Sequence, residues 1–155
     1  MTFRRIAFAI SLTTVLLGPP LVARASTTTA EVNKALVEHA MNALFVQRDL
    51  SALKRYWGGH PYIQHNPHID NGIEALAKLV RRLPAHFRYV PGMVVAEGNL
   101  VMMHGLYIGF GPKPLVAVDI FRIRHGRIVE HWDVMQPEVP PTETASGNPM
   151  FAPGH

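Results

Sequence analysis

Asp119 and His104 are two ionisable residues in stretches of sequence that are otherwise rich in apolar side chains. A carboxyl group enclosed by apolar side chains can give and take protons near neutral pH, because burial disfavours its charged form. A neighbouring imidazole can share that proton or polarise a carbonyl group of a substrate. The two residues are therefore candidates for acid/base catalysis. They could instead form a structural ion pair in the core or lie in solvent.

The second half of the chain must position these residues, and its composition predicts strands. Long runs of Val, Ile, Leu, Met and aromatic residues are separated by short stretches rich in Gly, Pro and Asn, which favour tight turns. The pattern therefore predicts an antiparallel meander of four strands. Their expected ranges are 87–96, 100–110, 115–123 and 127–135.

The predicted turns decide which side chains share a face, because side chains alternate along each strand. A two-residue turn between the last two strands places Asp119 opposite Trp132. A four-residue loop before it places Leu106 opposite Asp119 and His104 on the diagonal. Phe121 then lies on the same face and adds to an apolar wall for a ligand. One β-bulge would change this alignment. If Asp119 and His104 instead form a structural pair or face solvent, Trp132 is a packing residue.

The first half of the chain predicts helices. Thr28 and Glu31 fit a capping box, and apolar residues then recur at helical spacing to about Arg48. A short helix at 53–56, capped by Asp49, a short strand at 62–65 and a helix at 73–83, capped by Asp70 or Asn71, should follow. Helices followed by antiparallel strands indicate an α+β fold in which a curved sheet covers the helices.

Other kinds of chemistry have little support in the sequence. His60, His65 and His68 could suggest a metal site together with Asp70, but a loop with two prolines does not place them on one face, so no metal is expected. The chain has no Cys, which excludes disulfides and thiol nucleophiles. It has neither a Gly-x-Ser-x-Gly elbow nor a phosphate-binding glycine loop before a helix, so no nucleotide cofactor is expected.

Residues 1–25 have the pattern of a secretory signal. Arg4 and Arg5 precede about a dozen apolar residues, and Ala23-Arg24-Ala25 supplies a small-x-small cleavage site. The apolar run is shorter than the ~20 residues that span a bilayer, although a retained anchor is the alternative. Cleavage near Ala25 would lower the net charge from +4 to +1 and remove most of the excess positive charge. We therefore expect an exported protein, periplasmic or secreted, that binds no nucleic acid and has no stable membrane span.

Four stretches in this order resemble a known family. They read Tyr62-Ile-Gln-His-Asn-Pro67, Asp119-Ile-Phe-Arg122, Gly126-Arg-Ile-Val-Glu-His-Trp-Asp-Val134 and Gly147-Asn-Pro-Met-Phe151. The chain resembles the SnoaL-like polyketide cyclases, specifically the predicted aldol condensation-catalysing branch of the nuclear-transport-factor-two-like superfamily. The resemblance covers nearly all of residues 30–151, and its most specific part is the Glu-His-Trp-Asp-Val stretch.

The resemblance implies a fold, a site and a reaction. The fold is a cone-shaped α+β barrel, in which three N-terminal helices pack on a strongly curved, mixed but mostly antiparallel sheet around one cavity. In the characterised cyclases a cavity aspartate acts as acid and base in an intramolecular aldol ring closure, without metal, cofactor or covalent intermediate. The matching position here is Asp119, with His104 as its histidine partner. His65 and Trp132 would line the pocket, and Asp133 would point outward by alternation.

These arguments lead to one expectation for the whole chain. Residues 26–135 form the domain and 136–155 a proline-rich tail. The protein is expected to be a cofactor-free aldol/cyclase or isomerase that acts on a small apolar carbonyl compound; the alternative is a secreted binding module with the same cavity. Pairing through the exposed sheet face would give a homodimer. The expected substrate-binding residues are His65, Trp132, Phe121, Leu106 and Tyr62.

Overall fold

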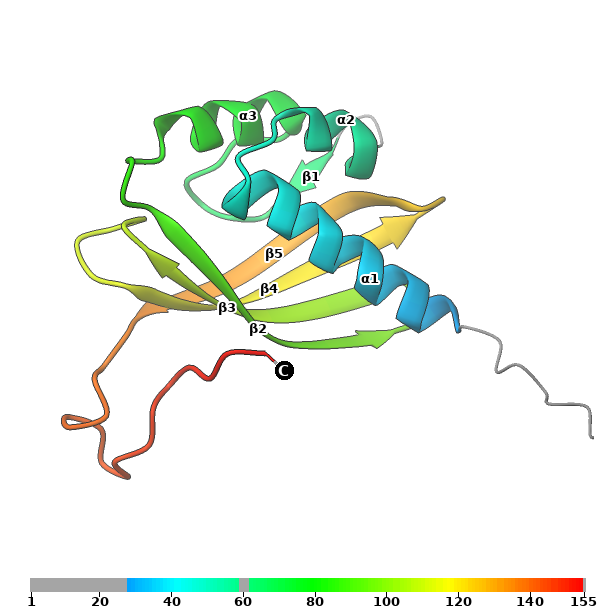
Figure 1. Ribbon diagram of the computed structural model, residues 1–155. Helices are drawn as coiled ribbons and strands as arrows, with labels where there is room; N and C mark the ends of the chain where they lie inside the picture. Colours follow the sequence, from blue (N-terminus) through cyan, green and yellow to red (C-terminus); the bar gives the residue numbers. More distant parts are fainter. Residues whose placement is uncertain (1–27, 59–61, 155) are drawn as a thin grey trace, which may run out of the picture.

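Three α-helices lie on one face of a five-stranded sheet in a computed structural model that describes residues 28–58 and 62–154 (Figure 1). The predicted export signal and its cleavage site lie outside the described residues. The helices are α1 (Thr29–Met41), which continues into the π-helical turn η1 (Asn42–Val46), α2 (Ser51–Tyr56) and α3 (Ile73–Arg82). No helix in this part of the chain is both long and apolar enough to span a bilayer.

The helix ends show one correct and one incorrect prediction. The backbone N–H of Thr28 donates to the Glu31 carboxylate at 2.7 Å, and the Thr28 hydroxyl accepts from the Glu31 N–H at 3.2 Å, which confirms the capping box. The predicted side-chain cap of α3 is wrong, because the residue before this helix is Gly72, which offers none. Asn71 instead accepts a hydrogen bond from the backbone N–H of Gln64 at 2.8 Å. Its side chain therefore holds a strand in place.

The sheet is mixed and mostly antiparallel, as predicted. Its strands are β1 (Ile63–Gln64), β2 (Arg88–Glu97), β3 (Leu100–Ile108), β4 (Leu115–Arg124) and β5 (Arg127–Pro137). Their order is β1-β5-β4-β3-β2; β1 runs parallel to β5, and the other neighbours are antiparallel. The α+β class and the packing of three N-terminal helices on this sheet are confirmed. The sheet is open, since β1 and β2 form its two edges.

The predicted register around Asp119 is wrong, and a bulge is one cause. Arg122 pairs with Glu130 but Ile123 pairs with Ile128, so Val129 is an extra residue in β5. From this point the partners are shifted by one residue, and Asp119 lies opposite Asp133 instead of Trp132.

The connection between β3 and β4 adds a second shift. On this side Asp119 pairs with Met103 and not with Leu106, because the connection is longer than the predicted four-residue loop and Tyr107 pairs with Leu115. His104 pairs with Val118, so its side chain lies on the other face of the sheet from that of Asp119. An odd shift in register exchanges the two faces, and the predicted meeting of Asp119 with His104 therefore does not occur.

The two faces of the sheet differ in what covers them. The inner face lies under the helices and carries the buried core, including Val101, Met103 and Phe121. The outer face is partly covered by the C-terminal tail, which runs past the side of the sheet opposite the helices (Figure 1). The Phe151 ring lies 5.3 Å from the His104 ring, and the backbone N–H of Gly154 donates to the carbonyl of Pro91. The tail thus lies along the body of the protein.

Candidate functional site

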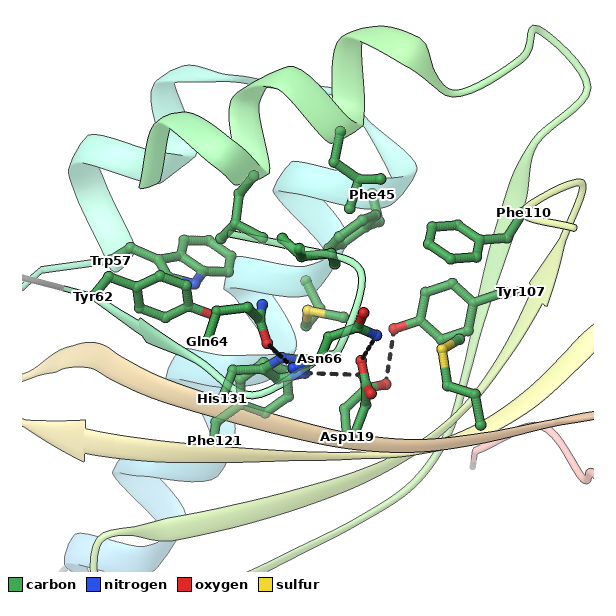
Figure 2. Close-up of a pocket in the computed structure, with 16 residues that line it drawn as sticks. Phe45, Trp57, Tyr62, Gln64, Asn66, Tyr107, Phe110, Asp119, Phe121 and His131 are labelled. Carbon is green, nitrogen blue, oxygen red and sulfur yellow. Dashed lines mark hydrogen bonds and ion pairs between the residues drawn. The ribbon is translucent and has the colours of Figure 1, made fainter. Parts of the chain in front are cut away.

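A pocket lies between the helices and the inner face of the sheet (Figure 2). Its space for water-sized molecules is about 40 Å³, and it shares part of its lining with an open groove of about 630 Å³. The apolar lining residues are Met41, Phe45, Trp57, Tyr62, Ile69, Leu76, Leu79, Tyr107, Phe110, Phe121 and Met135, and the polar ones are Gln64, Asn66, Asp119, His131 and Asp133. The pocket is therefore an apolar chamber with a few polar groups, and this composition of the lining is typical of small-molecule sites.

Asp119 is the most deeply buried carboxylate of the pocket, with 2% of its surface exposed. The Tyr107 hydroxyl donates to Asp119 Oδ2 at 2.8 Å, and His131 Nε2 lies 3.1 Å from Oδ1. These three residues come from inner-facing positions of β3, β4 and β5. Three adjacent strands therefore hold the carboxylate from both sides.

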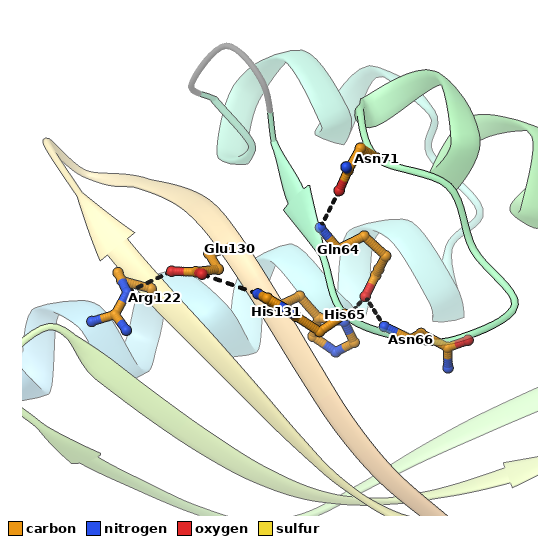
Figure 3. Close-up of polar contacts among 7 residues, drawn as sticks. All are labelled: Gln64, His65, Asn66, Asn71, Arg122, Glu130 and His131. Atoms are coloured by element: carbon orange, nitrogen blue, oxygen red, sulfur yellow. Dashed lines mark hydrogen bonds and ion pairs between the residues drawn. The ribbon is translucent and has the colours of Figure 1, made fainter.

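The orientation of the His131 ring is set by Gln64. The backbone N–H of Asn66 donates to Gln64 Oε1 at 3.0 Å, which identifies this atom as the amide oxygen (Figure 3). His131 Nδ1 lies 2.9 Å from the same oxygen and must therefore carry a hydrogen, since a carbonyl oxygen only accepts. The other ring nitrogen, Nε2, faces Asp119.

This network leaves one proton to be shared between His131 and Asp119. With Nδ1 protonated, Nε2 accepts from a protonated Asp119 or, as an imidazolium, donates to its carboxylate. In the second state the carboxylate is a base whose negative charge is balanced by the imidazolium and the Tyr107 hydroxyl. A proton can therefore pass between His131 and Asp119 inside the pocket.

A second carboxylate, Asp133, also belongs to the pocket, contrary to the expectation that it points outward. The side-chain N–H of Asn66 donates to Asp133 Oδ2 at 2.7 Å. One side-chain atom each of Asp119, His131 and Asp133 lies within 4.8 Å of the others, an arrangement that could hold a metal ion. In the same cluster His131 Nε2 and Asp119 Oδ1 are in direct contact at 3.1 Å, which is the geometry that proton transfer needs.

The tyrosines around the site are held in their neutral form. Burial, and then the negative charge of Asp119, raises the pKa of Tyr107 well above its ordinary value of about 10. Burial likewise raises the pKa of Tyr62 and Tyr89. Tyr107 therefore remains a hydrogen-bond donor to Asp119 across the physiological pH range.

The structure brings three of the predicted site residues together and separates four. Asp119, Tyr62 and Phe121 line the pocket, whereas His104, Leu106, His65 and Trp132 do not. The His65 and Trp132 rings stack at 4.7 Å on the outer face. His65 Nε2 lies 3.0 Å from Glu130 Oε1, and Arg122 Nε donates to Glu130 Oε2 at 2.7 Å (Figure 3). We call His65, Arg122, Glu130 and Trp132 the outer cluster; it is separate from the pocket.

Sequence reasoning missed the polar groups of β5 that lie near Asp119. His131 and Asp133 are two residues apart on a strand and must share a face, opposite the side chains of Glu130 and Trp132. By the same alternation, the side chains of Tyr62 and Gln64 share a face. These pairings were readable from the sequence, but the extra residue in β5 decided which of the two sets lies inside.

Solved structures of other proteins share this fold. A Kribbella flavida protein provisionally assigned as a ketosteroid isomerase matches with a TM-score of 0.63 and 14% identity, over 83% of this chain and 95% of the other. A Bacillus cereus protein provisionally assigned as a polyketide cyclase has a TM-score of 0.58 and 14% identity, over 68% and 75% of the two chains. An M. tuberculosis LEH-like epoxide hydrolase has a TM-score of 0.54 and 22% identity, over 70% and 86%. At these identities the likeness concerns the fold alone.

The sequence itself matches a family, although it matches no curated protein. Residues 36–131 fit the SnoaL-like domain and include most of the helices, the pocket aspartate and its histidine partner. This match covers more than half of the chain. The protein belongs to the SnoaL-like family.

Proposed function

We propose that the protein is a cofactor-free acid/base enzyme of aldol/cyclase or isomerase type, which acts on a small apolar carbonyl compound. The observation that carries the proposal is the buried Asp119 carboxylate at the wall of an apolar pocket, paired with His131. A carboxylate so placed can remove a proton from the carbon next to a carbonyl group. The fold is shared with proteins provisionally assigned as a cyclase and an isomerase, which supports this class of reaction.

The proposed proton transfer uses groups that are already in contact. Asp119 takes the proton as the carbon–hydrogen bond breaks, and the electron pair of that bond moves into the carbonyl group to give an enolate. His131 stays fixed by Gln64 and balances the charge on Asp119 during the transfer. Asp119 then returns the proton to a carbon or an oxygen of the product. The surrounding apolar side chains exclude water, which strengthens these electrostatic effects.

Exchange of protons for deuterons tests this step without knowledge of the natural substrate. Ketones such as cyclohexanone and cyclohexane-1,3-dione, in deuterated water, should lose their α-proton NMR signals faster with the protein than without it. Asp119→Asn should abolish the acceleration, and Glu130→Gln in the outer cluster should keep it. Equal rates for Asp119→Asn and wild type would refute the role of Asp119. Acceleration of no ketone would favour a binding module with the same pocket.

We also propose that residues 1–25 direct export, a point that rests on the sequence pattern. Expression of the full chain in a bacterium, followed by fractionation and N-terminal sequencing, should give a periplasmic or secreted protein that begins near Ser26. An intact N-terminus in the membrane fraction would instead indicate an anchor.

A homodimer through the outer sheet face remains part of the proposal. Val95, Met102, Val118 and Val134 are exposed on this face, and exposed apolar side chains on a sheet favour association. Sedimentation should show a dimer that Val134→Glu converts to a monomer. A monomeric wild-type protein at high concentration would contradict this.

A further inference from the structure

Two hydrogen-bond donors of the pocket have no partner. Trp57 Nε1 and Gln64 Nε2 are shielded from solvent, and neither makes a hydrogen bond; the two residues are only 3% and 9% exposed. Among the residues that the structure describes, the one other buried side-chain nitrogen or oxygen without a partner is His104 Nδ1, on the outer face. Buried polar groups are nearly always paired, because an unpaired donor loses its hydrogen bonds to water on folding. Two such donors in one pocket therefore call for a ligand.

The two donors belong to the same end of the pocket. Tyr62 and Gln64 are two residues apart, so their side chains share a face, and Trp57 follows α2 and is joined to β5 through a bridge to Ile128. Figure 2 shows Trp57, Tyr62 and Gln64 on one side of His131 and Asp119 on the other. The Trp57 indole makes no hydrogen bond to the Tyr62 hydroxyl, although it is near enough to reduce the rise in pKa that burial gives Tyr62.

Neither nitrogen can become an acceptor. The indole N–H of Trp57 only donates. The amide of Gln64 cannot be turned around, because its oxygen already accepts from the Asn66 backbone and from His131 Nδ1. This end of the pocket therefore suits an oxygen atom that accepts hydrogen bonds, and it disfavours an apolar group.

We propose that Trp57 and Gln64 form a subsite that binds a carbonyl oxygen of the ligand. The inference deepens the proposed function and rests on it for the class of ligand. Because the imidazole ring of His131 separates this subsite from Asp119, the oxygen bound here is several bonds away from the carbon that Asp119 deprotonates. The geometry thus favours a substrate with two oxygen functions, one beside the reacting carbon and one held at the subsite.

The two tryptophans of the chain provide an internal control for a direct test. Trp57 lines the pocket, and Trp132 lies in the outer cluster. In ¹⁵N–¹H spectra of the full protein, cyclohexanone should move the indole N–H signal of Trp57 downfield and leave that of Trp132 in place. Methylenecyclohexane, which has the same shape without the oxygen, should not produce this shift. An unmoved Trp57 signal up to the solubility limit of the ketone overturns the proposal.

Affinity measurements on variants provide a second test of the subsite. Trp57→Phe keeps the ring but removes the donor and should weaken cyclohexanone binding about fivefold. Gln64→Glu keeps an acceptor for His131 and Asn66 while removing the N–H donor, and should weaken it similarly or more. Trp132→Phe is the matched control and should bind the ketone as wild type does. Wild-type affinity in both pocket variants also overturns the proposal.

The outcomes separate this subsite from the proposed reaction. If Asp119→Asn keeps the ketone-induced shift of Trp57 and exchanges α-protons as fast as wild type, the subsite stands and the assigned reaction fails. If the shift is absent while Asp119→Asn abolishes exchange, the reaction stands and the subsite fails. The two failures are therefore distinguishable in the same pair of proteins.

Discussion

The sheet carries a histidine–carboxylate pair on each face, and the two pairs have nearly the same length. His131 and Asp119 are 3.1 Å apart on the inner face, and His65 and Glu130 are 3.0 Å apart on the outer face. The side chains of the inner pair are 10% and 3% exposed, whereas those of the outer pair are 41% and 16% exposed. Distance alone therefore does not distinguish a candidate active site from a surface contact.

The two pairs differ in their exposure to water and in the groups that surround them. Around the inner pair, Gln64 and Tyr107 supply fixed hydrogen bonds in an apolar chamber, where charges are weakly screened. Around the outer pair, Arg122 supplies an opposite charge and solvent screens the whole cluster. The inner pair is thus organised for proton transfer and the outer pair for modest surface stabilisation. The following tests act on this contrast.

The largest expected difference between the faces is seen in alkali. The pKa values of Tyr62, Tyr89 and Tyr107 are raised by burial on the inner face, so their neutral forms are favoured in the folded protein. Their stabilising contribution is complete below the unfolded pKa of about 10 and is lost as the pH rises above it. Above this pH, each tyrosine should lower the free energy of unfolding by about 1.4 kcal/mol per pH unit, and the three together by about 4 kcal/mol.

Urea unfolding at a series of pH values above 10, with tyrosinate absorbance as a second signal, checks this prediction. Tyrosinate should form together with unfolding, and Tyr107→Phe should reduce the pH slope by about a third. Ionisation of all four tyrosines in a protein that stays folded would show that the inner face is open to water.

The sequence was sufficient to predict the strands of the fold, but not to predict which side chains lie on each face of the sheet. Residue spacing and turn composition place the four long strands within a few residues, since Arg88–Glu97 was expected at 87–96 and Leu115–Arg124 at 115–123. They could not place Val129 outside the ladder, because a bulge depends on how β5 packs against the whole molecule. Its effect is nonetheless decisive, since it brings His131 and Asp133 to Asp119 and puts Trp132 outside.

Removal of the inner carboxylate should cost more than removal of the outer one. Asp119→Leu leaves the Tyr107 hydroxyl and His131 Nε2 buried without a partner, and should lower the free energy of unfolding by about 2–4 kcal/mol. Asp119→Asn should be nearly neutral, because its oxygen can accept from Tyr107 and its N–H can donate to His131 Nε2. Glu130→Leu in the outer cluster should cost about 1 kcal/mol or less. Chemical denaturation of the three variants provides the ranking, and equal costs for the two Leu variants would remove the contrast.

The contact between the C-terminal tail and the outer face should contribute to stability without affecting the pocket. Phe151 is largely buried against His104, so Phe151→Ala should cost about 1–2 kcal/mol of unfolding free energy, less than a full core truncation. Because the pocket lies on the other face, the ketone-induced NMR shift of Trp57 should stay as in wild type. Loss of that shift would mean that the two faces are coupled.

The smallest expected effect is the acid dependence of the outer cluster. Burial alone would raise the pKa of Glu130, but hydrogen bonds from Arg122 and His65 outweigh it and lower the pKa below its ordinary 4.5. A carboxylate with a lowered pKa stabilises the fold above its unfolded value and loses that contribution as the pH falls through its folded value. Glu130→Gln should therefore be less stable than wild type by less than about 1 kcal/mol at neutral pH, and the two should converge below pH 4.5. Added salt should shrink the gap, because the cluster is partly exposed to solvent. A gap of several kcal/mol that persists in salt would place the outer pair in the same class as the inner one.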